Sequence, residues 1–204
     1  MPKAFTETEK ERIRAQLMER GMTHFSRTGV RAARVGDICA DVGIAKGSFY
    51  AFFASKEDLF MAIADDRDLM HKRDMMAMLK AETGNAPAVL GRFFDFMRDR
   101  TEGDPVLRVV RDRGEILHLM RKVSPEHIAE NNRRDHEFMR DVSALLQSRY
   151  QLPCADAQTL ENLLAIMLSV ALQEEHFKAA GTYDATMALL RDMFVARLVE
   201  GPKS

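Results

Sequence analysis

A short polar segment, residues 46–50, and two basic residues on either side of it carry groups suited to a nucleic-acid backbone. Lysine and arginine side chains pair with phosphates, and serine and tyrosine hydroxyls donate to phosphate oxygens or base edges. A glycine in such a segment lets the backbone approach a ligand closely. The candidate contact residues are Arg34, Lys46, Gly47, Ser48, Tyr50 and Lys56.

A second group of residues could bind a metal. Glu115 precedes His118 by three positions, and Asp68 precedes His71 by three. On a helix such a pair shares one face, and paired motifs of this kind hold metals in helical bundles. The pattern is also common on exposed helices, and the additional bridging carboxylates are not identifiable. We therefore expect no metal, and we retain as the alternative a helical-bundle metal-binding protein or enzyme using Glu115 and His118.

Other catalytic patterns are not recognisable. No serine, cysteine or histidine shows the spacing of a nucleophile, a base and an orienting group, although such groups can also meet in space. We expect no enzyme and no cofactor.

Residues 35–59 must position the polar segment. Ile38, Cys39 and Val42 recur at helical spacing and give a short helix one apolar face. Gly43 then suits the left-handed conformation that ends a helix. A second short helix opens at residue 45 or 46 and buries Phe49, with its polar residues outward. This pattern predicts a helix-turn-helix, whose second helix fits a DNA major groove.

This stretch resembles the tetracycline-repressor (TetR) type of bacterial transcription regulator. The matching residues are Phe25, Gly29, Val35, Asp37, Ile38, Cys39, Val42, Gly43, Ile44, Lys46, Gly47, Ser48, Phe49, Tyr50, Phe53, Ser55, Lys56, Glu57, Asp58 and Leu59. Ala45 and Ala33 stand where the family usually has a hydroxyl residue. The resemblance implies a homodimeric regulator, most often a repressor, that binds a palindromic DNA operator and releases it when a small, largely apolar effector binds.

The rest of the chain predicts further helices and no strand. Thr8 with Glu11 has the spacing of a helix-capping pair, and Ser55 with Asp58 repeats it before a long helix that ends near Ala81. Helix-stopping residues follow at 83–85, 103–105, 124–125, 152–154 and 181. The prediction is an all-α protein of about nine helices. Residues 1–55 would form the helix-turn-helix DNA-binding domain, and residues 56–204 the helical effector-binding and dimerisation domain.

The last two predicted helices, about 157–180 and 183–200, carry surplus apolar residues. The first is apolar around most of its circumference, which indicates burial on both sides. A second copy related by a two-fold axis is the simplest partner. We expect a homodimer through residues 157–200, which agrees with the family resemblance.

The family resemblance also implies an effector cavity in the C-terminal helices. Methionine and phenylalanine are frequent there, and methionine adapts to varied apolar shapes. Such residues at helical spacing are also ordinary core residues. A DNA-binding scaffold without an effector is therefore a further alternative. The candidate wall residues are Phe93, Met97, His118, Met139 and Met167.

Composition sets limits on the other classes of protein. Residues 1–60 hold ten Lys/Arg against eight Asp/Glu, and the whole chain has a net charge of −1, which is far from a non-specific nucleic-acid binder. Two isolated cysteines suit a reducing compartment. The first residues lack the apolar region of a signal peptide, and the run 163–172 is too short to span a bilayer. We expect a cytoplasmic protein with no membrane contact.

Overall fold

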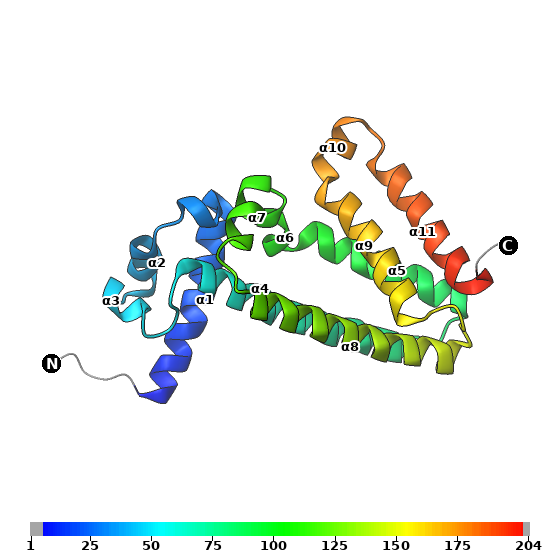
Figure 1. The fold of residues 1–204 in the computed structure, drawn as a ribbon, viewed down its shortest axis with the longest axis horizontal. Coiled ribbons are helices and arrows are strands. Elements are labelled where there is room, and N and C mark those ends of the chain that lie inside the picture. The colour runs from blue at the N-terminus through cyan, green and yellow to red at the C-terminus, as the bar shows by residue number, and fades with distance from the viewer. Residues whose placement is uncertain (1–5, 202–204) are drawn as a thin grey trace. The chain divides into compact units, whose positions relative to one another are not determined.

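The computed structural model describes residues 6–201, and every regular element in this range is a helix (Figure 1). The predicted absence of a signal peptide rests mainly on residues 1–5, which lie outside this range. The helices are α1 (Glu7–Ala32), α2 (Val35–Val42), α3 (Lys46–Phe49), α4 (Lys56–Ala81), α5 (Ala86–Gly103), α6 (Pro105–Val110), α7 (Arg113–Met120), α8 (Pro125–Tyr150), α9 (Ala157–Leu172), α10 (Glu174–Ala179) and α11 (Tyr183–Glu200). The predicted all-α class is confirmed. Among residues 6–201, no helix has the length and apolar character needed to cross a bilayer.

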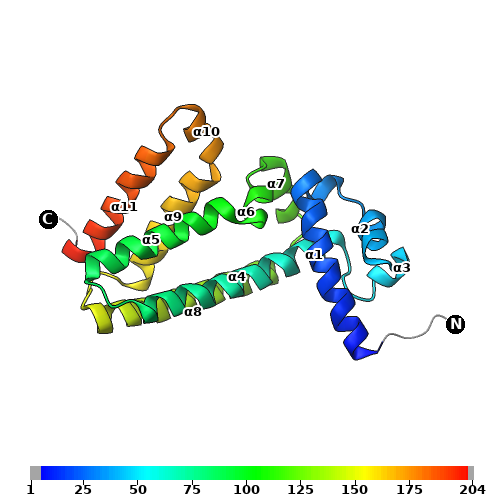
Figure 2. The ribbon, with the colours of Figure 1, turned by 180° about the vertical axis from the view of Figure 1, so that it is seen from behind.

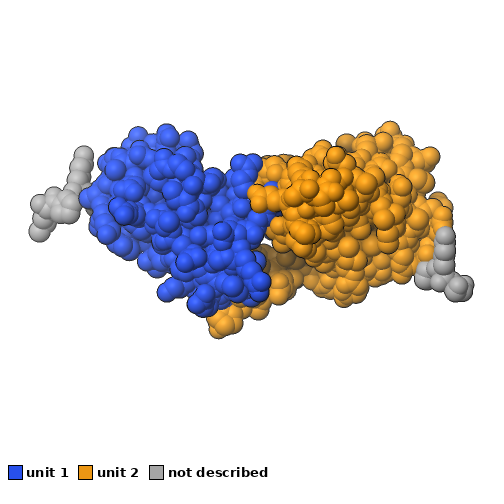
Figure 3. Space-filling model, turned by 90° about the horizontal axis from the view of Figure 1, so that it is seen from above, with its two compact units in different colours: residues 1–69, 105–124 blue, residues 70–104, 125–204 orange. Residues whose placement is uncertain are grey.

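The chain forms two compact units. Unit 1 contains residues 1–69 and 105–124, and unit 2 contains residues 70–104 and 125–204 (Figure 3). Unit 1 thus gathers α1–α3, the first half of α4, and α6 and α7. The assignment of DNA binding to residues 1–55, and of effector binding and dimerisation to residues 56–204, stays a prediction.

Unit 1 is built around aromatic residues from α1, α3 and α4. The rings of Phe25 in α1 and Phe60 in α4 meet edge to face, with centroids 5.6 Å apart. Phe49 of α3 is fully buried and lies 5.9 Å from the ring of Phe53. Ile38 contributes the apolar face of α2 to the same core. The short helices α2 and α3 are therefore held in place by side chains that pack into a shared core.

Unit 2 is a bundle in which α5 packs against α9 and α11. The ring of Phe194 in α11 lies 5.6 Å from Phe93 and 5.7 Å from Phe94, both in α5. Residues 70–81 of α4 run beside α8 (Figure 2). The hydroxyl of Tyr150, the last residue of α8, donates to the carbonyl of Glu82 at 2.8 Å and so ties the ends of these two helices together.

The structure has eleven helices in its described range where the sequence predicts about nine. The predicted helix 157–180 divides at Gln173, whose φ of −102° and ψ of 19° are not helical. The segment 105–123 divides because the Asp112 carboxylate caps a new helix by accepting from the Gly114 and Glu115 amides. The predicted cap of α1 by Thr8 is wrong: Thr6 and Glu9 form the capping box two residues earlier. The predicted cap of α4 by Ser55 is confirmed, since its Oγ accepts from the Asp58 amide at 3.0 Å.

Candidate nucleic-acid interface

The turn between α2 and α3 depends on one glycine. Gly43 has φ of 77° and ψ of 30°, a left-handed conformation that most residues with a side chain adopt only at a cost. Its amide donates to the Ala40 carbonyl at 3.2 Å, and the Ile44 amide donates to the Cys39 carbonyl at 3.0 Å. These bonds satisfy the carbonyl groups at the end of α2 and redirect the chain into α3.

The short helix α3 has one buried and one exposed side. Phe49 fills the core of unit 1, and the Tyr50 ring lies edge to face on it at 5.4 Å. Tyr50 nevertheless keeps 54% of its surface exposed. Lys46 and Gly47 are also exposed, and a Cβ at Gly47 would meet no atom within 4 Å. Ser48 is half-buried between the two sides. The outward side of α3 is therefore open to a large partner.

The two basic residues outside α3 differ in their surroundings. Arg34 is exposed at the residue that precedes α2. The ammonium of Lys56 donates to the carbonyls of Arg31 at 2.6 Å and Ala33 at 3.0 Å. Lys56 thus already holds the segment between α1 and α2. Two of the three ammonium N–H groups are used in these bonds, so only the third could donate to a phosphate. The predicted phosphate contact of Lys56 stays a prediction.

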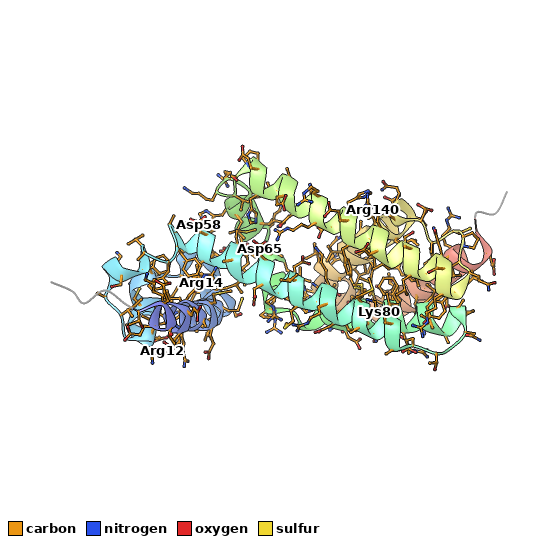
Figure 4. The ribbon with its side chains drawn as sticks, turned by 90° about the horizontal axis from the view of Figure 1, so that it is seen from below. Arg12, Arg14, Asp58, Asp65, Lys80 and Arg140 are labelled. Atoms are coloured by element: carbon orange, nitrogen blue, oxygen red, sulfur yellow. The ribbon has the colours of Figure 1, made fainter. Side chains whose placement is uncertain are left out.

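Further basic residues lie on α1. Figure 4 shows Arg12 and Arg14 projecting from different sides of this helix. The guanidinium of Arg14 lies over the Phe53 ring, 5.0 Å from its centroid. In α2, burial raises the pKa of the Cys39 thiol, while the charge of Lys46 opposes this effect. Cys39 is therefore a neutral core residue at physiological pH.

Glu115 occupies a place that the sequence does not predict. It is only 8% exposed, and its Oε2 accepts from the amides of Val30 at 2.9 Å and Arg31 at 3.1 Å. These amides are available because Gly29, with φ of 76° and ψ of 165°, interrupts α1. Gly29 belongs to the family pattern, but nothing in the sequence connects it to a carboxylate in α7.

The histidines of the two Asp/Glu-x-x-His patterns pair with carboxylates elsewhere in the chain. His118 Nε2 lies 2.7 Å from Glu57 Oε1, and His71 Nε2 lies 2.7 Å from Asp104 Oδ2. Within residues 6–201, no group of three or more His, Cys, Asp or Glu side chains could hold a metal ion. Because Glu115 is occupied by backbone amides, the metal-binding alternative using Glu115 and His118 is not supported.

The predicted effector residues fall in both units. Phe93, Met139 and Met167 are buried in the core of unit 2, and Met97 packs against that core. His118 lies in unit 1. Their assignment to an effector cavity stays a prediction.

A groove of about 680 Å³ lies in unit 1 and contains none of these residues. It is lined by Glu11, Arg14, Ala15, Met18, Glu19, Met22, Thr23, Ser26, Ile63, Asp66 and Arg67.

An apolar surface lies on the last helices of unit 2. Ile166 of α9 is 52% exposed, and Leu189 and Met193 of α11 are 60% and 55% exposed. A cavity of about 240 Å³ adjoins them and is lined by Thr159, Asn162, Leu163, Met193 and Arg197. Large exposed apolar side chains that gather on two neighbouring helices are typical of a protein–protein interface.

Comparison with known proteins covers both the sequence and the fold. Residues 17–63 match the family described as bacterial regulatory proteins, tetR family. Over 163 residues the chain is 23% identical to an HTH-type transcriptional repressor of Streptomyces coelicolor, a match that covers 80% of this chain and 78% of that protein. The family match contains α2, α3 and the start of α4.

Solved structures share the fold over nearly the whole chain. A TetR-family transcriptional regulator from Pectobacterium atrosepticum is similar with a TM-score of 0.69 at 20% identity, covering 98% of this chain and 100% of that chain. The transcriptional regulator FadR from Bacillus subtilis, solved in complex with stearoyl-CoA, has a TM-score of 0.61 at 16% identity, with coverages of 93% of this chain and 99% of that chain. A regulator from Saccharomonospora viridis, solved with choline, has a TM-score of 0.67 at 16% identity, with coverages of 93% and 98%.

Proposed function

Because the chain belongs to the TetR family of bacterial regulatory proteins, we propose that it is a transcriptional repressor that binds double-stranded DNA through α3. The observation that carries this proposal is that Phe49 anchors α3 in the core, while Lys46 and Gly47 of α3 and Tyr50, the residue that follows it, are exposed. A helix held in this way can enter a major groove. DNA as the partner implies a cytoplasmic protein.

The DNA contacts can be tested with a fragment selected from genomic DNA by the purified protein. Lys46→Ala should weaken binding and lower the slope of log affinity against log salt by about 1, as expected for one lost phosphate contact. Tyr50→Phe removes only a hydroxyl and should weaken binding with the fold intact. Lys80→Ala, an exposed lysine in unit 2, is the matched control. Wild-type affinity in both test variants would remove these two contacts from the proposal.

A second copy of the chain is the proposed partner of the apolar surface on α9 and α11. Burying Ile166, Leu189 and Met193 between two copies would remove their apolar surface from water. A two-fold dimer would present two α3 helices to a palindromic operator, about 34–36 Å apart on one face of the duplex. Met193→Glu should shift the protein to monomers in sedimentation, whereas Leu69→Glu, an exposed leucine of unit 1, should not. A dimeric Met193→Glu protein would argue against this surface.

The proposed effector is a small, largely apolar molecule bound within the C-terminal helices. The methionine- and phenylalanine-rich core of unit 2 supports the apolar character of the effector. The similar structures solved with stearoyl-CoA and with choline support the binding of a small molecule by this fold. An effector of this class should raise the melting temperature and release the DNA fragment. If a screen of acyl-CoA thioesters, fatty acids and quaternary amines changes neither property, the protein is better described as a DNA-binding scaffold.

A further inference from the structure

One helix of unit 1 holds both ends of the helix-turn-helix. Glu115 and His118 lie three positions apart on α7, so both side chains lie on the same side of that helix. Glu115 bonds to the segment that enters α2, and His118 bonds to the first turn of α4, which leaves α3. Helix α7 lies outside the residues that match the family model, 17–63.

The entry contact is a charge-assisted pair of hydrogen bonds, of which the one from Val30 is buried and the one from Arg31 is partly buried. One carboxylate oxygen of Glu115 accepts from both the Val30 and the Arg31 amide. The bond to the Val30 amide is buried, so loss of the carboxylate would leave this amide without its acceptor. Gly29 makes the contact possible, because a Cβ at that position would lie 2.8 Å from the Glu115 Cδ.

The exit contact joins His118 to Glu57. The side chain of Glu57 is 12% exposed, and its Oε1 lies 2.7 Å from His118 Nε2. The adjacent Lys56 donates to the carbonyls of Arg31 and Ala33. The entry and the exit are thus linked to each other by Lys56 and are both linked to α7.

From this arrangement we propose that Glu115 and His118 are positioning residues for DNA binding. They fix the entry and exit of the helix-turn-helix and thereby the orientation of α3, without contacting DNA themselves. The inference rests on the proposed function, because it concerns how the same DNA-binding surface is held. It follows that the DNA-binding part of this chain includes α7, which the sequence separates from α3 by more than sixty residues.

The test measures binding of full-length variants to the genomic DNA fragment selected by the wild-type protein. Fluorescence anisotropy would be recorded from about 50 to 300 mM salt. The slope of log affinity against log salt concentration, called the salt slope below, reports the number of phosphate contacts. The variants are Glu115→Ala, Glu115→Gln, His118→Ala and Glu57→Gln. Glu126→Gln and His136→Ala, both exposed in unit 2, serve as matched controls, and His136 contacts a glutamate, Glu161, at 2.7 Å as His118 does. Circular dichroism at the binding temperature establishes that each variant is folded.

Glu115→Ala and His118→Ala should each weaken binding by roughly tenfold or more while the salt slope stays within about 0.5 of the wild-type value. Glu115→Gln should bind more tightly than Glu115→Ala, because the amide oxygen can still accept from both backbone amides. Glu57→Gln removes the negative charge but keeps an oxygen that accepts from His118 Nε2, so it should weaken binding less than His118→Ala. In the His118→Ala background the contact is already absent, so Glu57→Gln should have no further effect there.

Three results would overturn the inference. The first is wild-type affinity in both Glu115→Ala and His118→Ala. The second is a salt slope lowered by about 1 in either variant, which would make that residue a phosphate contact. The third is an affinity loss that matches the loss of folded protein, which would leave only a structural role. If the wild-type protein selects no DNA at all, the proposed function itself fails and the inference fails with it.

Discussion

Replacing Gly29 with alanine should strongly destabilise unit 1. Its φ of 76° and ψ of 165° fall in a region that residues with a Cβ adopt only at a cost of about 1–3 kcal/mol. The new methyl group would also displace the Glu115 carboxylate, whose Cδ lies 2.8 Å from the expected Cβ. Leaving the buried Val30 amide without its acceptor costs about 1–3 kcal/mol more. The expected total is about 2–6 kcal/mol.

The two contributions can be separated by repeating the substitution in a Glu115→Ala background. There the carboxylate is already absent, so Gly29→Ala should cost only the backbone strain, about 1–3 kcal/mol. The matched control is Gly36→Ala in α2, where an added Cβ would meet no atom within 4 Å. Alanine at this position should leave stability unchanged or raise it by up to about 1 kcal/mol.

Urea unfolding followed by circular dichroism measures these differences. All variants must be compared at one protein concentration, because dimerisation would make stability depend on concentration. Equal costs of Gly29→Ala in the two backgrounds would refute the contact between Gly29 and Glu115 as an energetic link. A cost below about 1 kcal/mol in the wild-type background would refute the backbone argument as well.

Three further changes test the packing, a helix cap and an ion pair. Phe194→Ala removes a ring that contacts both Phe93 and Phe94 in unit 2, and it should lower the free energy of unfolding by about 3–5 kcal/mol in urea titrations. Asn85→Ala removes the acceptor for the Ala88 amide at the start of α5, and it should cost about 1 kcal/mol in the same assay. Burial raises the pKa of Glu57, but hydrogen bonds from His118 and its own backbone amide, with the nearby charges of Lys56 and His118, lower it overall. This lowered pKa stabilises the fold above the ordinary glutamate pKa and ceases to do so as the pH falls, so the stability difference between wild type and Glu57→Gln should shrink in acid unfolding curves.

Local patterns in the sequence predict the helix-turn-helix well. The apolar spacing of α2, the glycine at 43 and the cap at Ser55 each depend on residues within a few positions of one another. Steric and hydrogen-bonding rules act at that range, so the order of the elements can be inferred without coordinates. The break at Gln173 is harder to predict, because neither glycine nor proline marks it.

The roles of Glu115 and Lys56 could not be predicted, because they depend on contacts between segments that are distant in the sequence. Glu115 and Val30 are separated by 85 residues, and the spacing of Glu115 and His118 suits a metal ligand pair as well as it suits a backbone contact. The role of Lys56 is equally hard to predict from the sequence, because a lysine at this place can bind a phosphate or donate to a backbone carbonyl. Only the fold shows that Lys56 bonds to Arg31 and Ala33.

Helix α3 consists of only four residues, Lys46–Phe49, which is about one turn. A synthetic peptide of that length would not stay helical in water, so the surface it offers exists only while Phe49 remains seated in unit 1. The same dependence makes the protein a suitable scaffold for retargeting. If α3 binds DNA as proposed, positions 46, 47 and 50 can be varied in a library to seek new DNA preferences while Phe49 and Gly43 are kept constant.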